Sequence, residues 1–378
     1  MSGHSAREPA PLYPGRRMSQ EHTLRAVALA LAADVPVLLW GLPGTGKSSV
    51  LRDIATGFGW QCEVVVASIR EPADFAGLPI VDGQSVRFAP PRWAERLATA
   101  GEGLLFLDEL STAAPAVQAA LLRVVLERSV GDIELPSGVR IVAAANPPEQ
   151  TADGWDLAAP LANRFCHLDW TVGQAEFERG FAAGWPRLKF AGLPPDWERW
   201  TVRARHMVSA FSRVRPSLVA QIPNDGSRAS RGWPSPRSWE MTARLLGAAE
   251  AVGADQATKM LLVAGSVGQG AGVEFLTWLT ELDLEDPEAA LADPSSLVLP
   301  ERGDRALAVL MSVVAAVAAN PTAERWRAAW KVLATAANGQ ADIGAVAARY
   351  LARYRPDGVE APAEVELFEP VLRAAELM

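Results

Sequence analysis

Gly41-Leu-Pro-Gly-Thr-Gly-Lys-Ser48 is the stretch on which the interpretation of this chain depends. It matches the pattern GxxxxGK[ST], follows an apolar run (Val37–Trp40) that predicts a strand, and opens a predicted helix from Lys47 to about Thr56. Glycines allow backbone angles and close approaches that a Cβ would forbid, so the amides of such a loop can surround an anion at the helix N-terminus. The sequence therefore predicts a phosphate-binding loop.

We expect ATP and Mg²⁺ to be the ligands of this loop. Its Lys47 ammonium can reach the β- and γ-phosphates, and its Ser48 hydroxyl can coordinate the metal ion. A glycine-rich turn that matches by chance is the alternative, and the strand–loop–helix context argues against it. The residues expected to contact the nucleotide are Gly41, Leu42, Pro43, Gly44, Thr45, Gly46, Lys47, Ser48 and Ser49.

A second motif, Leu104-Leu-Phe-Leu-Asp-Glu109, predicts a buried strand that ends in two adjacent carboxylates. Asp108 is expected to lie beside Mg²⁺, and Glu109 to orient and polarise the attacking water as a catalytic residue. Burial of two acids costs free energy unless a cation or other partners compensate. The alternative is that the two carboxylates only cap the following helix. An acidic pair after a phosphate loop favours hydrolysis over phosphoryl transfer to a small molecule.

Three more polar residues follow these motifs in the chain. Asn146 ends another apolar run, from Ile141, where its amide can position water or contact the γ-phosphate; the alternative is an Asn that begins the turn before Pro147. Arg164 and Arg237 are each, taken alone, more typical of surface ion pairs than of catalysis. Their order after the two phosphate motifs makes both of them candidates for the site.

Composition places these motifs in a large folded protein. The chain has 378 residues, 49% of them hydrophobic and 21% charged, with a net charge of −8. The acidic balance argues against extensive nonspecific binding to nucleic acid. Two cysteines exclude a disulfide framework and are typical of a reducing compartment. With no apolar signal core near the start, we expect a soluble, cytoplasmic protein without membrane insertion.

Short apolar runs alternate with helical patterns up to about residue 170, which predicts an α/β domain with a parallel sheet flanked by helices. The expected strands are Val37–Trp40, Cys62–Ala67, Leu104–Leu107 and Arg140–Ala145. Beyond residue 172 only helical patterns remain. We predict an N-terminal tail (1–19), an α/β domain (20–172), a helical domain (173–282), an acidic linker (283–296) and a C-terminal helical segment (297–378).

Over roughly residues 20–282, these motifs resemble those of AAA+ ATPases, and within them the MoxR-like group. GLPGTGKS resembles the Walker A motif of that family, and LLFLDE resembles its Walker B motif. AAAN, which ends at Asn146, resembles sensor 1. LANRF resembles the stretch with the arginine finger, here Arg164. SPRSW resembles sensor 2 of the helical lid, here Arg237, and the predicted helical domain would be that lid.

Two predicted hairpins also support the MoxR-like group. The stretch Leu78–Pro90 has a turn signal at Asp82-Gly83 between extended runs, where this group carries an insertion. The stretch Ser129–Arg140 resembles the hairpin that precedes sensor 1.

The resemblance implies a homo-oligomer, in this family a hexameric ring, in which Arg164 enters the site of the adjacent subunit. It also implies work on a client or partner protein, typically a separate polypeptide with a von Willebrand A-type domain. Two alternatives stay open: a nucleic-acid motor or loader of the same superfamily, and a scaffold that binds nucleotide without turnover. The acidic composition argues against the first alternative, and the presence of all the motifs together argues against the second.

Overall fold

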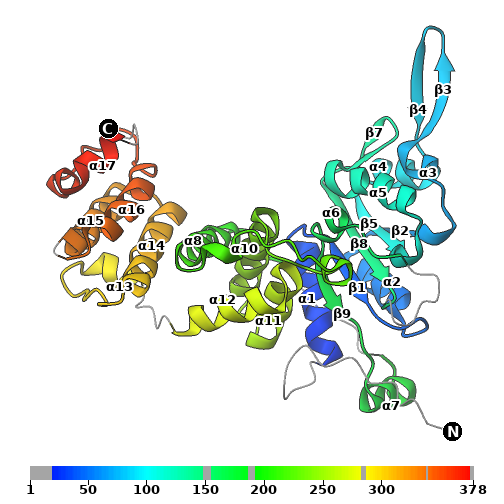
Figure 1. Ribbon diagram of the computed structural model, residues 1–378, viewed down its shortest axis with the longest axis horizontal. Helices are drawn as coiled ribbons and strands as arrows, with labels where there is room; N and C mark the ends of the chain where they lie inside the picture. Colours follow the sequence, from blue (N-terminus) through cyan, green and yellow to red (C-terminus); the bar gives the residue numbers. More distant parts are fainter. Residues whose placement is uncertain (1–18, 148–154, 186–191, 282–286, 338, 375–378) are drawn as a thin grey trace. The chain divides into compact units, whose positions relative to one another are not determined.

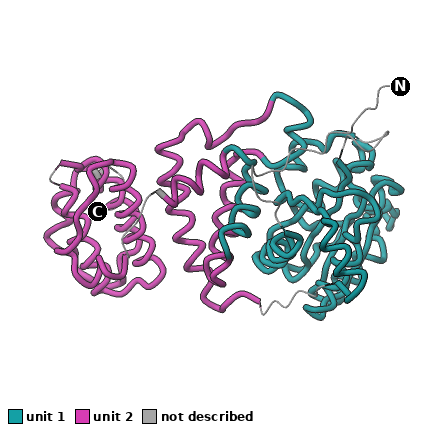
Figure 2. Tube along the Cα trace, turned by 90° about the horizontal axis from the view of Figure 1, so that it is seen from below, with its two compact units in different colours: residues 1–191, 224–232, 255–270 teal, residues 192–223, 233–254, 271–378 magenta. Residues whose placement is uncertain are grey.

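The computed structural model describes residues 19–147, 155–185, 192–281, 287–337 and 339–374, so residues 1–18 of the predicted tail lie outside the described residues. The chain forms two compact units, drawn in teal and magenta in Figure 2. Unit 1 comprises residues 1–191, 224–232 and 255–270, and unit 2 comprises residues 192–223, 233–254 and 271–378. The chain therefore crosses between the two units several times.

Unit 1 is built around a five-stranded sheet in which every neighbouring pair is parallel, in the order β2-β5-β8-β1-β9. Its strands are β1 (Val37–Trp40), β2 (Gln61–Val66), β5 (Glu102–Asp108), β8 (Gly138–Ala145) and β9 (Cys166–Asp169). The first four confirm the predicted strands and the predicted parallel sheet. Sequence analysis missed β9, because a run of four residues that includes a histidine and an aspartate carries little strand signal.

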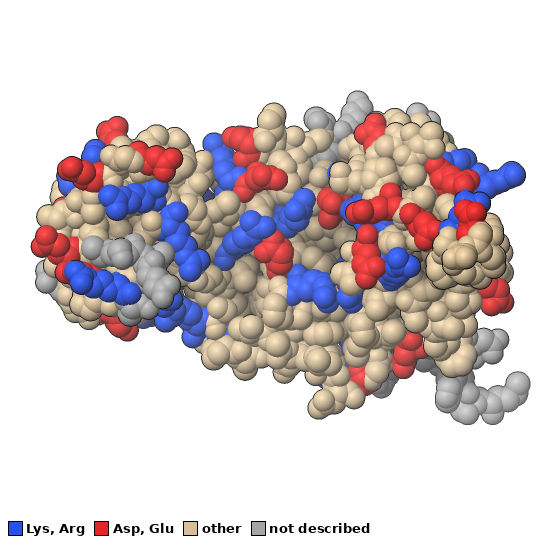
Figure 3. All heavy atoms as spheres, turned by 90° about the horizontal axis from the view of Figure 1, so that it is seen from above, with Lys and Arg blue, Asp and Glu red and all other residues tan. Residues whose placement is uncertain are grey.

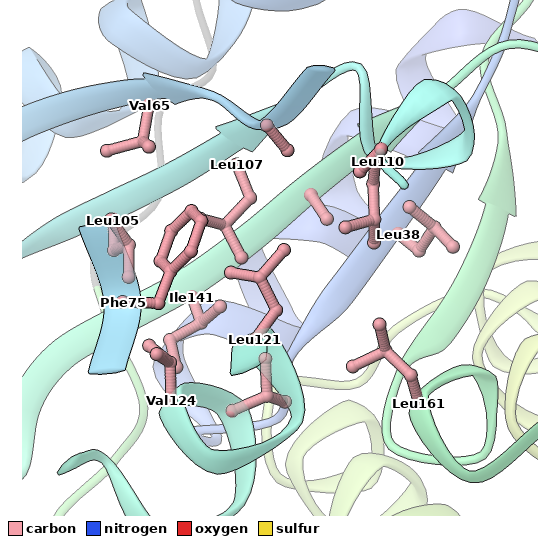
Figure 4. Packing of buried hydrophobic residues seen from close by; sticks show 14 of the residues in the cluster. Leu38, Val65, Phe75, Leu105, Leu107, Leu110, Leu121, Val124, Ile141 and Leu161 are labelled. Atoms are coloured by element: carbon pink, nitrogen blue, oxygen red, sulfur yellow. The ribbon is translucent and has the colours of Figure 1, made fainter. Parts of the chain in front are cut away.

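The central strands are apolar because both faces of the sheet are covered. All four residues of β1 are buried, as are residues 103–107 of β5. On one face, Leu105 and Ile141 pack with Leu121 and Val124 of helix α5 (Pro115–Glu127), as Figure 4 shows. Burial of each such side chain contributes roughly 1.5–3 kcal/mol. This core holds the carboxyl ends of the parallel strands together at one edge of the sheet.

Helices lie on both faces of the sheet (Figure 1). The remaining helices of unit 1 are α1 (Gln20–Ala32), α2 (Lys47–Phe58), α3 (Ala73–Ala76), α4 (Arg92–Ala100), α6 (Ala159–Ala162), α7 (Gln174–Ala183), α9 (Gly226–Ala229) and α11 (Gln256–Val267), with the 3-10 turns η1 (Ala67–Ile69) and η2 (Leu110–Thr112). Helix α2 begins at Lys47 as predicted and ends at Gly59, whose φ of 72° is typical of a C-cap glycine.

Both predicted hairpins are present. One joins β3 (Leu78–Asp82) to β4 (Ser85–Ala89), and the other joins β6 (Ser129–Val130) to β7 (Ile133–Glu134); both are antiparallel. In the first hairpin Asp82 still pairs with Ser85, so the turn consists of residues 83 and 84. This hairpin extends away from the sheet in Figure 1, and all but its last residue are exposed.

Within residues 192–281, 287–337 and 339–374 the structure contains helices and no strand, which confirms the predicted helical part. Unit 2 comprises α8 (Glu198–Val214), η4 (Pro216–Leu218), α10 (Pro236–Ala251), most of α12 (Gln269–Glu281), α13 (Pro287–Ala292), α14 (Gly303–Ala319), α15 (Ala323–Ala334), η5 (Thr335–Ala337), α16 (Ala341–Ala352), η6 (Ala363–Phe368) and α17 (Glu369–Ala374). Helix α13 lies within the stretch expected as a linker, with Ala290 and Leu291 buried. No helix among the described residues is long and apolar enough to span a bilayer.

Candidate functional site

The predicted phosphate loop lies between the end of β1 and the start of α2. Its glycines are required for different reasons. A Cβ on Gly41 would approach the carbonyl oxygen of Trp170 to 2.5 Å, so only glycine fits there. Gly44 and Gly46 have φ values of 77° and 85°, and a Cβ on either would meet no atom within 4 Å. The loop therefore leaves an open face in front of the N-terminus of α2, where backbone N–H groups favour an anion.

Lys47 connects this loop to the neighbouring strand β8. Its ammonium donates to the carbonyl oxygens of Gly41 at 2.6 Å and Leu42 at 2.9 Å, and to Oδ1 of Asn146 at 3.3 Å. The side chain is buried, and burial lowers the pKa of Lys47, whereas the negative charge of Asp108 acts in the opposite direction. The structure thus brings Lys47, Asn146 and Asp108 together, as the motifs predicted.

Ser48 and Asp108 form the second contact across the sheet edge. The Ser48 hydroxyl donates to Oδ2 of Asp108 at 3.0 Å. A hydroxyl and a carboxylate oxygen are hard ligands of the kind that Mg²⁺ takes together with phosphate oxygens. Among the described residues no group of three His, Cys, Asp or Glu side chains could hold a metal ion. The oxygen atoms of Ser48 and Asp108 by themselves are of the kind that would hold Mg²⁺ only together with phosphate oxygens.

Glu109 begins the turn after β5 in an unusual backbone conformation. Its φ is 56° and its ψ is 41°, the left-handed region, which costs a non-glycine residue roughly 1–2 kcal/mol. Its carboxylate is exposed and accepts a hydrogen bond from the hydroxyl of Ser68, which follows β2. The carboxylate is therefore directed toward the β2 side of Asp108 and does not act as a helix cap.

Asn146 is held by its backbone as well as by its side chain. Its N–H donates to Oγ of Ser111 at 3.1 Å, and the Ser111 hydroxyl lies 3.2 Å from the carbonyl oxygen of Asn146. This serine is buried in η2, directly after the acidic pair. The amide therefore faces Lys47 from a fixed backbone position, although Asn146 also precedes Pro147 as the turn interpretation expected.

The two arginines are not part of this group of contacts. Arg164 follows α6, is partly buried, and donates to the carbonyl oxygen of Pro160. Arg237 is the second residue of α10 in unit 2 and is exposed. Helix α10 begins as predicted, with Ser235 as its N-cap. The roles of both arginines, like those of Leu42, Pro43, Thr45 and Ser49, stay predictions.

The contacts of His167, the second residue of β9, were not predicted from the sequence. The Trp40 indole N–H donates to Nδ1 of His167 at 2.9 Å, and His167 Nε2 lies 2.9 Å from the carbonyl oxygen of Ala162. An indole N–H can only donate, so Nδ1 accepts and Nε2 carries the proton. Burial lowers the pKa of His167 to about 3, which keeps the ring neutral. A lone histidine in an apolar run gave no signal of these contacts.

The comparisons with known proteins concern the same part of the chain. Residues 36–167 match the family model described as "ATPase family associated with various cellular activities (AAA)". Protein MoxR of Methylorubrum extorquens is 30% identical over 161 residues, which is 39% of this chain and 44% of that protein. The transcriptional regulatory protein ZraR of Escherichia coli K12 is 31% identical over 160 residues, 40% of this chain and 34% of that protein. The chain thus matches less than half the length of these relatives.

A solved structure from Cytophaga hutchinsonii aligns with 71% of this chain and 91% of its own length, at 16% identity and a TM-score of 0.47. The similarity to this family is carried instead by the matched domain, by the five-stranded parallel sheet and by the loop between β1 and α2. Residues 36–167 thus form a domain similar to the AAA ATPase family and, among the curated relatives, to Protein MoxR.

Proposed function

We propose that the protein hydrolyses ATP in a ring of identical subunits and uses this cycle to remodel or activate a partner protein, a separate polypeptide with a von Willebrand A-type domain. One observation carries the ATPase part. Lys47 contacts Asn146 and Ser48 contacts Asp108, so side chains at or just beyond the carboxyl ends of the neighbouring strands β1, β8 and β5 meet at one edge of the sheet. Ligands of parallel sheets bind at this carboxyl edge.

In the proposed reaction each residue has one task. Lys47 binds the β- and γ-phosphates, and Ser48 and Asp108 hold Mg²⁺. The metal ion supplies electrostatic stabilisation of the charge on the phosphoryl oxygens. Glu109 accepts a proton from the attacking water and orients it, which requires its carboxylate to leave Ser68 for the water. Asn146 holds the water or a phosphate oxygen.

One part of the proposal, the ring assembly, concerns contacts between chains. It is supported by the similarity to this family, whose finger arginine acts on a neighbouring subunit's ATP, and Arg164 would have this role. Rings follow from head-to-tail interfaces of this kind. Within one chain, Arg237 would link the nucleotide to the lid.

The partner protein is supported by the β3–β4 hairpin. In its register Pro79 pairs with Phe88 and Val81 pairs with Val86, so one face of the ribbon is apolar. Val81 is 77% exposed and Phe88 is 43% exposed. An exposed apolar face on a two-stranded ribbon suits contact with a protein better than contact with a nucleic acid. On the face drawn in Figure 3, basic and acidic side chains are interspersed, which also argues against the nucleic-acid motor.

The test uses Glu109→Gln in the full chain. This variant should bind ATP as tightly as the wild type and hydrolyse it about 10²–10⁴-fold more slowly, because the amide cannot accept the proton. Turnover near the wild-type rate would assign the base elsewhere. The same variant, loaded with ATP, should retain the partner protein in a pull-down, and salt-sensitive retention of DNA or RNA would favour the motor. A wild-type chain that binds ATP without turnover would favour the scaffold.

A further inference from the structure

Trp170, the residue that follows β9, contacts the phosphate loop at two points. Its indole Nε1 donates to the carbonyl oxygen of Thr45 at 3.0 Å. Its own carbonyl oxygen lies against Gly41, where a Cβ would approach it to 2.5 Å. Trp170 is only 1% exposed, so the surrounding core holds the ring in this position. One buried residue therefore contacts the loop near both of its ends, through its side chain at Thr45 and through its backbone at Gly41.

The hydrogen bond from Trp170 sets the orientation of the peptide group between Thr45 and Gly46. In a trans peptide the C=O and N–H groups point in opposite directions. Because the carbonyl of Thr45 turns toward Trp170, the N–H of Gly46 turns to the other side. Gly46, with φ 85°, directly precedes α2, and the N–H groups of such a loop are those that bind phosphate.

A second set of contacts holds Trp170 in register with the loop. Its backbone N–H donates to the carbonyl oxygen of Trp40 at 2.6 Å. Asp169, just before it, forms an ion pair with Arg231 at 2.8 Å, and the Arg231 guanidinium lies over the Trp40 ring at 4.2 Å from the centroid. Arg231 thus contacts the last residues of both β1 and β9. The ends of these strands, and with them the loop and Trp170, are held at a fixed spacing.

We infer that Trp170 is a positioning residue of the nucleotide site, which keeps the Thr45–Gly46 peptide in the orientation that receives the phosphates. The inference rests on the proposed function. Trp170 does not itself touch the nucleotide. Its contribution is to raise the fraction of free protein whose loop is competent to bind, and the apparent affinity follows that fraction. The loop surrounds phosphates common to both nucleotides, so ATP and ADP are affected alike.

The test compares Trp170→Phe with Trp93→Phe in the full chain. Phenylalanine keeps a ring at position 170 and removes the N–H donor. Trp93 is also buried in unit 1, at 6% exposure, and its Nε1 has no hydrogen-bond partner among the described residues, so its replacement removes no such bond. Affinity is measured by titration with fluorescent ATP and ADP analogues. Hydrogen–deuterium exchange of residues 41–49 is followed without nucleotide.

For Trp170→Phe we expect affinity for both nucleotides to fall by about 3- to 10-fold, the usual consequence of losing one hydrogen bond. The KM for ATP should rise by a similar factor while kcat changes less than about 2-fold. Exchange in the loop should become faster. Trp93→Phe should match the wild type in affinity, kinetics and loop exchange.

A Trp170→Phe variant with wild-type affinity and wild-type loop exchange would overturn the inference. A lower melting temperature with unchanged affinity would also overturn it, because that result assigns Trp170 a structural role only. A wild-type chain that fails to bind nucleotide would overturn the proposed function as well, so the two failures are distinguishable.

Discussion

The nucleotide site and the β3–β4 hairpin belong to the same unit but are built in opposite ways. At the site, Lys47 is 8% exposed and its ammonium has three acceptors within 3.3 Å. In the hairpin, both faces are exposed, and the contacts are those between its two strands and at its base, where the Phe88 N–H donates to Asp132 at 2.6 Å. The proposed chemistry, which needs fixed distances, is assigned to the region where many contacts determine each side chain, and the proposed partner surface is assigned to the region where few do.

The largest expected effect on nucleotide affinity comes from Lys47, whose ammonium has three hydrogen-bond acceptors. Lys47→Ala removes the buried ammonium that is proposed to bind the phosphates, and charge-assisted hydrogen bonds are the stronger kind. ATP affinity should fall by more than about 100-fold in a nucleotide titration. Lys331→Ala, at an exposed position on α15, should bind ATP as the wild type does. Unchanged affinity in Lys47→Ala would remove the basis for the phosphate loop.

The next prediction concerns turnover and tests whether one chain supplies every residue of its own catalytic site. Arg164→Ala should lower ATP turnover by about 10³-fold if this arginine acts as a finger. Because the finger and the loop would then come from different subunits, mixing Arg164→Ala with Lys47→Ala chains should restore part of the activity. Arg179→Ala, exposed on α7, is the control and should turn over at the wild-type rate. No recovery in rings shown to contain both variants would contradict action between subunits.

A smaller effect concerns the pH dependence of stability, to which the buried His167 contributes. The pKa of His167 is about 3 in the folded chain and near 6.5 when unfolded, so the unfolded chain binds more protons between these values. Its stabilising contribution is therefore present above pH 6.5 and lost as pH falls toward 3. Lowering the pH from 6.5 to 5 should cost about 2 kcal/mol at this residue.

Melting temperatures of His167→Gln measured across this pH range should show a shallower decrease than the wild type. Val81→Ala, which removes no ionisable group, is the control and should keep the wild-type slope. Equal slopes for His167→Gln and the wild type would contradict a neutral, buried His167.

The smallest effect concerns the hairpin and its stability. Val81 is 77% exposed and Val142 of β8 is fully buried. Val81→Ala should change the free energy of unfolding by less than about 0.5 kcal/mol, whereas Val142→Ala should cost about 2 kcal/mol through lost burial and a cavity. Partner retention should respond in the opposite order, with Val81→Ala weakening it more. Equal losses of stability would show that the hairpin is packed after all.

Much of unit 1 could be predicted because its signals are local. The runs that became β1, β2, β5 and β8 are apolar over consecutive residues, and the turn glycine at position 83 marks the first hairpin. The contacts of Trp170 and Arg231 could not be predicted. The Arg231–Asp169 pair joins residues 62 positions apart, and neither belongs to a recognisable pattern.

The sequence by itself determined the phosphate loop, the acidic strand end and the sheet that carries them, because each depends on neighbouring residues. Only the tertiary structure decided that Ser68 holds the Glu109 carboxylate and that the tryptophan directly after β9 holds the loop backbone. Strand order is the physical reason: β9 lies beside β1 although 125 residues separate Trp170 from Thr45. Such pairings arise from packing of the whole sheet, which no local pattern encodes.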